Sequence, residues 1–369
     1  MDSDNLRLIV FKNCIDLGRK VDMHIQEKRG ISKSFIVPIK EVRFNNGEGK
    51  ISIDDTIRDK DVYILSDTQN HHITYKMYNY INHMSPDDHF LDIKRTISAI
   101  NCQANSIHVI EPLLYASRQH QRNGRESLDC AMALQDLEDM GVKTLITFDA
   151  HDPKAQMAVK RMGFENFYPS NTMLNYFVSN ENIGDYENLM VISPDYGAMK
   201  RARIYADMLK VKEIGFFDKR RDYSKIVNGK NPIIEHKYIG GDVSSKDIII
   251  VDDMIASGGS ILDVAKQLKE KGANKIFLMA TFALFTNGYE IFDEYYDKGI
   301  INRIYTTNLT YVDDVIKKRK WFSEVDCSLY IAEIIDRLSN HQSISDIINK
   351  KEIVKIRKRT LWEDDNDVF

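Results

Sequence analysis

The sequence has few cysteines and no long hydrophobic run. Its four cysteines, Cys14, Cys102, Cys130 and Cys327, are scattered without a CxxC pair, which argues against a disulfide framework and favours a reducing cytoplasm. The longest apolar stretch, 276–285, is about half the length that a membrane-spanning helix needs, so we expect a buried strand and no membrane partner. The opening residues MDSDNLRLIV lack a basic region followed by a long apolar one, so we expect no signal peptide.

The sequence also lacks a strong charge of either sign. It holds 51 Lys and Arg against 55 Asp and Glu, so no basic field is present to neutralise the phosphates of a nucleic acid. Nucleic acid is therefore not an expected partner. Low-complexity segments and linkers rich in Pro and Gly are missing as well, and the length of 369 residues favours about two domains.

Short β-branched and apolar runs alternate with helical patterns along the chain. Several runs are almost continuously apolar, as in parallel strands that are covered on both faces. Amphipathic helices are expected over 127–140 and 261–271, and a glycine follows each of them. This alternation predicts an α/β fold with mostly parallel sheets. The clearest expected strands are 8–11, 62–65, 107–110, 144–148, 189–192, 214–217, 248–251 and 275–280.

We divide the chain into domains 1–165 and 166–347, because the alternation of strand and helix begins again after Pro169. Each domain has a strand that ends in an aspartate, as at Asp149, although no convincing sequence repeat is present. Residues 348–369 combine a basic run with the acidic WEDDND, and we expect a solvated C-terminal extension there.

The segment IIIVDDMIASGGS joins an expected buried strand directly to a helix. The strand carries two carboxylates to its carboxyl end, which is the edge of an open α/β sheet where ligands bind. The small residues that follow form a tight loop at a helix N-terminus, which suits a phosphate. The carboxylates suit sugar hydroxyls, so the segment predicts a phosphorylated-sugar site; the simpler alternative is a glycine turn after an acidic strand end. The site residues are Asp252, Asp253, Ala256, Ser257, Gly258, Gly259 and Ser260.

Two further motifs follow expected strands. In FDAHDP (148–153), Asp152 is a predicted N-cap, which leaves His151 to face the cleft. In SPDYGAMKRA (193–202), Asp195 lies at a sheet edge, where its oxygens could bind a hard cation. The alternatives are a capped turn with an incidental histidine and a structural aspartate cap.

The motif FFDKRR (216–221) is a strand that runs into a basic loop. If the backbone stays extended, Lys219 and Arg221 share a face and could clamp a phosphoryl group as it is transferred. A solvated basic loop is the simpler alternative. The polar stretch that follows, 222–231, is interpreted as a mobile lid.

Together these segments resemble the ribose-phosphate pyrophosphokinase (PRPP synthetase) family, across roughly residues 5–347. The resemblance implies two tandem phosphoribosyltransferase-like (Rossmann-like) domains. It implies that His151 and Asp195 bind the Mg²⁺ of ATP, and that Lys219 and Arg221 lie on a flexible catalytic loop.

The resemblance extends to two segments that contact ATP in this family. In RFNNGEG, the residues Phe44, Asn46 and Glu48 match a segment that reads adenine, often from a neighbouring subunit. In YASRQHQRNGRES, Arg118 and Gln119 match an Arg-Gln pair on the nucleotide. On their own the two segments indicate only a hairpin turn and an exposed helix start.

The chain departs from the family at several positions. Asn46 and His120 replace aspartates, and Ala256 stands where many members have a third aspartate in the sugar-phosphate loop. Asp326 lies where serines help to hold a regulatory phosphate in the phosphate-activated class. Because an acid would repel that phosphate, we expect weak or absent activation by inorganic phosphate.

The sequence thus favours a cytoplasmic, homo-oligomeric enzyme, a hexamer or a dimer, that uses ATP, Mg²⁺ and ribose 5-phosphate to form PRPP and AMP. Two alternatives stay open. A phosphoribosyltransferase would use the sugar-phosphate loop but not the ATP segments. A non-catalytic homologue would bind PRPP or nucleotides and regulate a true synthetase.

Overall fold

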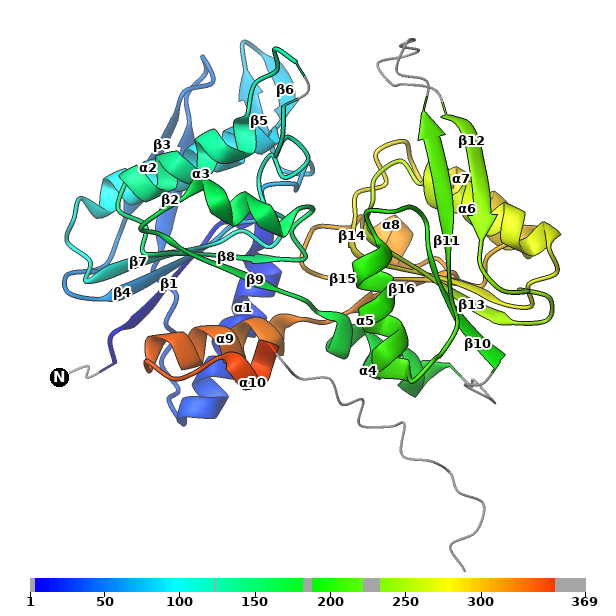
Figure 1. Ribbon diagram of the computed structural model, residues 1–369. Helices are drawn as coiled ribbons and strands as arrows, with labels where there is room; N and C mark the ends of the chain where they lie inside the picture. The colour runs from blue at the N-terminus through cyan, green and yellow to red at the C-terminus, as the bar shows by residue number, and fades with distance from the viewer. Residues whose placement is uncertain (1–3, 123, 182–187, 222–232, 349–369) are drawn as a thin grey trace, which may run out of the picture.

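Two α/β units lie side by side in the computed structural model (Figure 1). The structure describes residues 4–122, 124–181, 188–221 and 233–348, with the backbone alone described at 219–221 and 233–236. Each unit has one central sheet covered by helices on both faces, as the alternation of strands and helices predicts.

The first sheet has five strands, all parallel to their neighbours. The side chains of β1, β4 and β7, and nearly all of those of β8, are buried on both faces, which explains their apolar runs, whereas the edge strand β9 is mostly half-buried. In order across the sheet they are β1 (Leu6–Val10), β4 (Asp61–Leu65), β7 (Ser106–Ile110), β8 (Thr144–Phe148) and β9 (Gly163–Phe167). One face packs against α2 (Pro86–Ile100) and α3 (Asp129–Asp139), and the other against α1 (Ile15–Arg29) and α9 (Ser328–Ser339).

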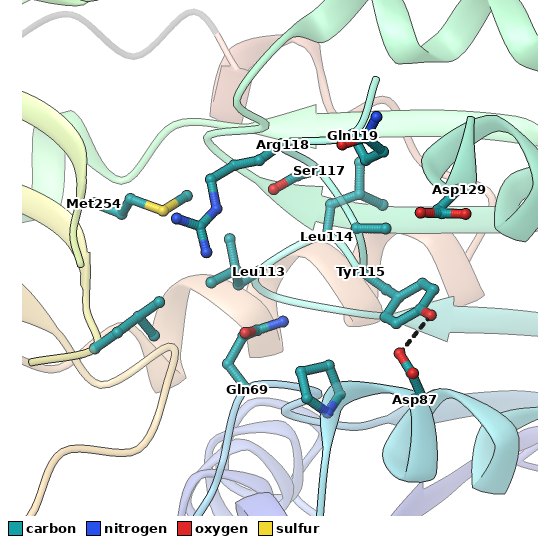
Figure 2. A pocket seen from close by; sticks show the side chains of 13 residues that line it. Gln69, Asp87, Leu113, Leu114, Tyr115, Ser117, Arg118, Gln119, Asp129 and Met254 are labelled. Atoms are coloured by element: carbon teal, nitrogen blue, oxygen red, sulfur yellow. Dashed lines mark hydrogen bonds between the residues drawn. The ribbon is translucent and has the colours of Figure 1, made fainter. Parts of the chain in front are cut away.

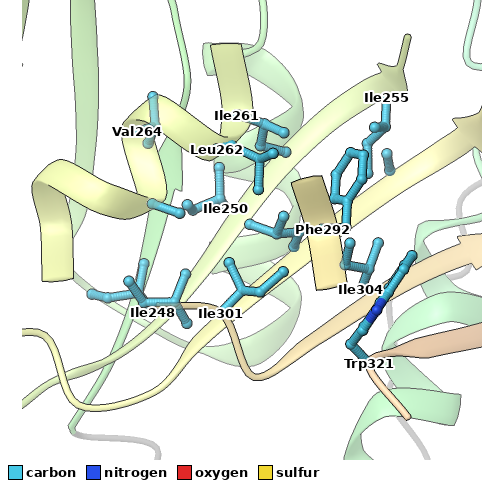
Figure 3. Close-up of a cluster of buried hydrophobic side chains, with 14 of the residues drawn as sticks. Ile248, Ile250, Ile255, Ile261, Leu262, Val264, Phe292, Ile301, Ile304 and Trp321 are labelled. Atoms are coloured by element: carbon cyan, nitrogen blue, oxygen red, sulfur yellow. The ribbon is translucent and has the colours of Figure 1, made fainter. Parts of the chain in front are cut away.

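The second sheet has seven strands, and the edge strand β12 is antiparallel to its neighbour. Its order is β12 (Ile233–Ile239), β11 (Ile214–Arg221), β10 (Leu189–Ser193), β13 (Asp247–Ile255), β14 (Ile276–Ala283), β15 (Arg303–Thr307) and β16 (Phe322–Val325). One face packs against α4 (Ser170–Asn180) and α5 (Met199–Leu209), and the other against α6 (Gly259–Glu270) and α7 (Glu290–Asp297). Figure 3 shows the second of these cores, where Phe292 and Trp321 stack at 5.6 Å.

Smaller elements complete the described chain. Two antiparallel hairpins extend from the first unit, and short helical turns connect the larger elements. These elements are the hairpins β2 (Ile39–Arg43) with β3 (Gly49–Ile53) and β5 (Thr74–Met77) with β6 (Tyr80–His83), the helices α8 (Asp314–Lys317) and α10 (Ser345–Ile348), and the 3-10 turns η1 (Lys12–Cys14) and η2 (Pro153–Ala158). No helix among the described residues is both long enough and apolar enough to cross a bilayer.

The eight strands and two helices expected from the sequence are all confirmed, with differences at their ends. The helices end as predicted, with the following glycines, Gly141 and Gly272, in the left-handed region. Strand β13 continues past Val251 to Ile255, because its backbone still pairs with β14 beyond the two aspartates. Hydrogen bonding to a neighbouring strand thus extends a strand that hydrophobicity alone would end.

The two units are joined by more than the chain between them. Strand β9 continues the first sheet to Phe167, and helix α9 returns from the second unit to pack against α1. Arg29 on α1 donates to Asp336 on α9 at 2.7 Å. We therefore propose that the first unit includes all of β9 and also α9, which lies later in the chain. The division of the chain at residue 165 stays a prediction. The predicted extension, apart from its first residue, lies outside the described residues.

A buried carboxylate, Asp67, forms a second link between the units. It follows β4 and accepts hydrogen bonds from the hydroxyl of Thr310, at 3.1 Å, and from the backbone N–H of Tyr311, at 2.7 Å. Both donors lie in the loop after β15. A buried carboxylate needs such donors to offset its lost hydration. This contact therefore fixes the carboxyl edge of the first sheet relative to that of the second.

Glu111 directly follows β7 and is also buried, at 1% exposure. One carboxylate oxygen accepts from the N–H of Tyr115 at 3.3 Å, and the other has no hydrogen-bond partner in the structure. Burial without full compensation raises the pKa of Glu111 to about 7. The folded protein therefore favours the protonated form of this side chain.

This pKa predicts a pH-dependent effect of Glu111→Gln. The wild-type carboxyl contributes most to stability below its unfolded pKa, 4.5, and this contribution is lost as the pH rises through about 7. Relative to wild type, we expect the variant to be more stable by about 2–3 kcal/mol at pH 8.5, and by much less at pH 5. Urea unfolding at both pH values measures this; a difference that does not change with pH would contradict the prediction.

Candidate functional site

The sugar-phosphate segment lies at the carboxyl edge of the second sheet. Strand β13 carries Asp252 and Asp253 to the side that faces the first unit, where Asp253 is 5% exposed. Burial and the neighbouring charge of Asp253 raise the pKa of Asp252 well above its usual value. Burial has the same effect on Asp253, but the hydrogen bond from His151 and the charge of Arg201 outweigh it, so the pKa of Asp253 is lowered.

The loop after these aspartates is shaped by one glycine. Gly258 has φ of +81°, and a Cβ at this position would lie 2.2 Å from Cζ of Phe292 in the core. Helix α6 begins at the next residue, Gly259, two residues earlier than the sequence predicts. Ser260 therefore lies in the first turn, where backbone N–H groups lack helical acceptors, and Ala256 and Ser257 precede it in the loop. Such a helix start suits an anion, as the sequence predicts.

A buried ion pair between the units supports this edge. Asp149, which follows β8, accepts from Nε of Arg201 at 2.9 Å and from its Nη2 at 2.7 Å. The hydroxyl of Thr281 on β14 donates to the same carboxylate at 2.6 Å. Burial alone would lower the pKa of Arg201, but the charge of Asp149 raises it overall, so the guanidinium stays charged. Its Nη1 also lies 4.0 Å from Asp252.

His151 joins the first unit to the acidic pair. Its Nδ1 lies 2.6 Å from Oδ2 of Asp253, a distance at which an Nδ1–H donates to the carboxylate. This hydrogen bond raises the pKa of His151. A carboxylate on one ring nitrogen fixes the orientation of the imidazole and leaves Nε2 available to a ligand. The ring of His120 lies 5.6 Å from that of His151, so the chain places two imidazoles at this point.

Asp195 lies in the turn after β10. Its Oδ1 accepts from the N–H of Ala198 at 3.2 Å, and the hydroxyl of Ser193 donates to its backbone carbonyl at 2.6 Å. The charge of Asp195 contributes to the raised pKa of Asp252, and that of Arg118 acts on the pKa of His151. The structure thus places Asp195 within electrostatic reach of Asp252, and Arg118 within electrostatic reach of His151.

The predicted cation clamp is placed only through its backbone. Strand β11 is extended through Lys219, which is opposite His236 on β12, and the register shifts between Arg220 and Arg221. The strand is four residues longer than predicted, because β12 pairs with it. The side chains of Lys219 and Arg221, and the predicted lid over 222–231, lie outside what the structure describes.

A cavity of about 290 Å³ opens between the two units (Figure 2). Arg118 and Gln119 line it from the first unit, and Met254 and Leu284 from the second. Across the cavity, the hydroxyl of Tyr115 donates to Asp87 at 2.7 Å. The Arg-Gln pair predicted to contact a nucleotide therefore lines a cavity between the units, to which the second unit contributes Met254, the residue after the acidic pair.

The predicted adenine-reading residues lie elsewhere. Phe44, Asn46 and Glu48 form the turn of the β2–β3 hairpin, closed by a bond of 2.8 Å from the N–H of Phe44 to the carbonyl of Glu48. The side chain of Phe44 is 49% exposed and does not line the cavity. The hairpin prediction is confirmed, but within one chain the structure does not bring these residues to the other site residues.

Sequence reasoning gave no role to Asp149, Arg201 or Thr281. Asp149 was visible as an aspartate at a strand end, and Arg201 stands inside the motif that contains Asp195. Asp149 also has φ of +43°, a left-handed conformation that is uncommon outside glycine. The position of Asp149 at the end of a predicted strand could have indicated a site residue. Its pairing with Arg201 could not be predicted, because that pairing depends on how the two units contact each other.

Two family models match the chain. The N-terminal domain of ribose phosphate pyrophosphokinase matches residues 6–141, and the phosphoribosyl synthetase-associated domain matches 224–349. A ribose-phosphate pyrophosphokinase of Mycoplasma genitalium is 28% identical over 354 residues, which cover 94% of this chain and 96% of that protein. Another, of Mycoplasma pneumoniae, is 29% identical and covers 83% and 86%, respectively.

The fold is also similar to a solved structure. The phosphoribosylpyrophosphate synthetase of Mycobacterium smegmatis superposes with a TM-score of 0.73 at 20% identity, covering 92% of this chain and all of that one. This similarity supports the arrangement of the two sheets described above.

The glycine in the anion loop predicts a specific loss of stability. In Gly258→Ala the new methyl group meets Phe292 and the left-handed backbone becomes strained, so we expect a loss of about 1–3 kcal/mol. Gly259→Ala is the matched control, because no atom lies within 4 Å of its Cβ position. Thermal unfolding of both variants measures the effect, and equal changes would contradict this explanation.

The buried ion pair predicts a larger loss. Arg201→Leu leaves the carboxylate of Asp149 buried without its partner, which we expect to cost about 3–5 kcal/mol. Arg203→Leu, an exposed position on the same helix, should change stability by less than about 0.5 kcal/mol. Adding Asp149→Asn to Arg201→Leu should restore part of the loss in urea unfolding. If the double variant is no more stable than Arg201→Leu, the pair is not the cause.

Proposed function

We propose that this chain, which belongs to the ribose-phosphate pyrophosphokinase family, transfers the β,γ-diphosphoryl group of ATP to the 1-hydroxyl of ribose 5-phosphate. The products are PRPP and AMP. The observation that carries the proposal is the bond of 2.6 Å between His151 of one unit and Asp253 of the other. It places a residue predicted to serve ATP directly beside the residues predicted to hold the sugar.

The sugar would bind at the edge of the second sheet. The 5-phosphate accepts hydrogen bonds from the loop Ala256–Ser260 at the start of α6, and Asp252 and Asp253 accept from ring hydroxyls. Arg201 lies behind the aspartates and lowers the cost of two adjacent carboxylates. The acidic pair thus orients the ring rather than repelling the phosphate, which binds several residues further along.

The triphosphate would bind on the side of His151, Asp195, Arg118 and Gln119. Mg²⁺ in nucleotide sites is usually held by one or two side chains together with phosphate oxygens, so these side chains need supply only part of its ligands. The donor set fits, because Nε2 of His151 is left available and Asp195 offers carboxylate oxygens. When bound, the metal would neutralise the charge of the triphosphate and orient it.

Transfer requires an in-line displacement. The 1-hydroxyl oxygen forms a bond to the β-phosphorus, the bond from that phosphorus to the bridging oxygen of the α-phosphate breaks, and AMP leaves. The hydroxyl proton is released in the same reaction. We propose that Lys219 and Arg221 stabilise the charge of the moving group, so that positioning and electrostatics suffice without a covalent enzyme intermediate.

We further propose that the chain forms a homo-oligomer, as the resemblance implies. The exposed turn with Phe44, Asn46 and Glu48 would then serve the nucleotide site of a neighbouring copy. A cytoplasmic location stays a prediction from the sequence.

One assay tests the activity against its alternatives. The purified chain is incubated with ATP, Mg²⁺ and ribose 5-phosphate, and AMP and PRPP are measured. We expect stoichiometric formation of both. Turnover only with PRPP and a free base would favour a phosphoribosyltransferase, and ligand binding without turnover would favour a regulatory homologue.

The clamp predicts how one variant behaves in this assay. Lys219→Ala should lower kcat by about 10²–10³-fold while ATP still binds, because the lost charge acts mainly in the transition state. Lys237→Ala removes an exposed cation from the paired strand and should leave kcat unchanged. Equal kcat values for Lys219→Ala and wild type would rule out the clamp.

A further inference from the structure

A second cavity, of about 640 Å³, lies between α4 and α5 of the second unit and α9 and α10. Figure 1 shows α9 and α10 beneath the first sheet, with α4 and α5 next to them in the second unit. None of the predicted site residues lines the cavity. It is thus separate from the proposed reaction and has no assigned occupant.

The walls of this cavity are largely apolar. Ile204 and Met208 of α5 face it from one side, and Leu329 and Tyr330 of α9 from the other. Leu329 is 54% exposed and Ile348 of α10 is 47% exposed, although both are aliphatic. Exposed aliphatic side chains that converge on one hollow indicate a surface that another segment covers.

The rim of the cavity is acidic. Asp326, Glu333 and Asp346 line it, against a single basic residue, Arg337. Asp326 is bonded to Lys20 at 2.7 Å, and Asp346 is paired with Arg337. The charge of Glu333 adds to that of Asp346 in raising the pKa of Arg337, so a single cation faces these two acids. The cavity therefore suits an occupant that combines aliphatic side chains with positive charge.

A segment of that composition begins at the cavity itself. Ile348 lines the cavity, and the sequence continues from it as NKKEIVKIRKR, residues 349–359, with three aliphatic residues, six cations and one acid. Ten extended residues reach about 33 Å, so the segment needs no long connection. Tethering at this position also gives it an effective concentration of about millimolar, which a free partner would have to exceed.

We propose that residues 349–359 of the same chain bind in this cavity, with aliphatic side chains against Leu329 and Ile204 and with cations against Glu333. The segment would contact both units at once, because α5 packs on the second sheet and α9 packs on α1. It would act as a strap that limits the movement of one unit relative to the other. The segment would then stabilise the relative position of the two units, and with it the proposed reaction site between them.

Binding of a labelled peptide tests this proposal. A fluorescein-labelled peptide of residues 349–362 is titrated, by anisotropy, against the full chain and against a chain that ends at Ile348. We expect the shortened chain to bind the peptide at least about 10-fold more tightly, because its cavity is not occupied by its own segment. Equal affinity for both chains, or no binding to either, would overturn the proposal.

Matched variants separate specific binding from simple charge attraction. In the shortened chain, Glu333→Lys should weaken the peptide by about 10-fold, whereas Glu270→Lys, an exposed acid on α6, should have little effect. A peptide with Ile353→Ser and Ile356→Ser should also bind more weakly. Equal loss with both lysine variants would mean that the peptide senses only net charge, which contradicts the proposal.

Two measurements keep the test decisive. If the shortened chain does not fold, it is replaced by the full chain with Ile353→Ser, Val354→Ser and Ile356→Ser. This variant should bind the unmodified peptide, and its helices α4 and α9 should exchange amide hydrogens faster than those of the wild type. Sedimentation of the full and shortened chains identifies the source of the occupant. Association that is lost on shortening would mean that the segment binds to another copy, and the proposal would be wrong.

Discussion

The pair of Asp149 and Arg201 is the interaction on which the meeting of the two units depends. Both charges are largely buried, and Asp149 is tolerable because Arg201 of the other unit is its partner; Arg201 also lies 4.0 Å from Asp252 of its own unit. Thr281 binds the same carboxylate, so three elements from two sheets are fixed relative to one another. With the units so placed, the bond between His151 and Asp253 can form, and residues of both units, such as Arg118 and Met254, line one cavity.

Most of the fold could be predicted from the sequence, because parallel strands that are buried on both faces are continuously apolar. The eight predicted strands and the helix after Gly258 all follow from that pattern and from glycine at helix ends. Strand ends were less accurate, since β11 and β13 extend as far as a neighbouring strand pairs with them. The last four residues of β11 are charged, and β13 passes through two aspartates before it ends, so no continuous hydrophobic pattern marks these extensions.

A candidate site could be located from the sequence where one local segment carries the predicted chemistry, as in the loop after Asp253, and the roles of its residues stay predictions. Site residues were harder to predict where their arrangement depends on how the two units contact each other. Arg201 carries no local signal, because its partners come from β8 and β13. The family resemblance supplied the expected roles of Arg118 and His151, and the structure adds that the charge of Arg118 acts on the pKa of His151. For Phe44 and Glu48 no arrangement within one chain places them beside those two residues.

The return of α9 to the first unit has a consequence for biosynthesis. The face of the first sheet that carries Leu8 and Tyr63 is covered by side chains of Ile331 and Ile335, more than 250 residues later in the chain. Helix α1 can cover part of this face early in synthesis, but the part under α9 can be buried only after residue 339 has been made. Until α9 has been made, the amino-terminal half keeps part of this apolar surface exposed, so its final packing depends on synthesis of the second unit.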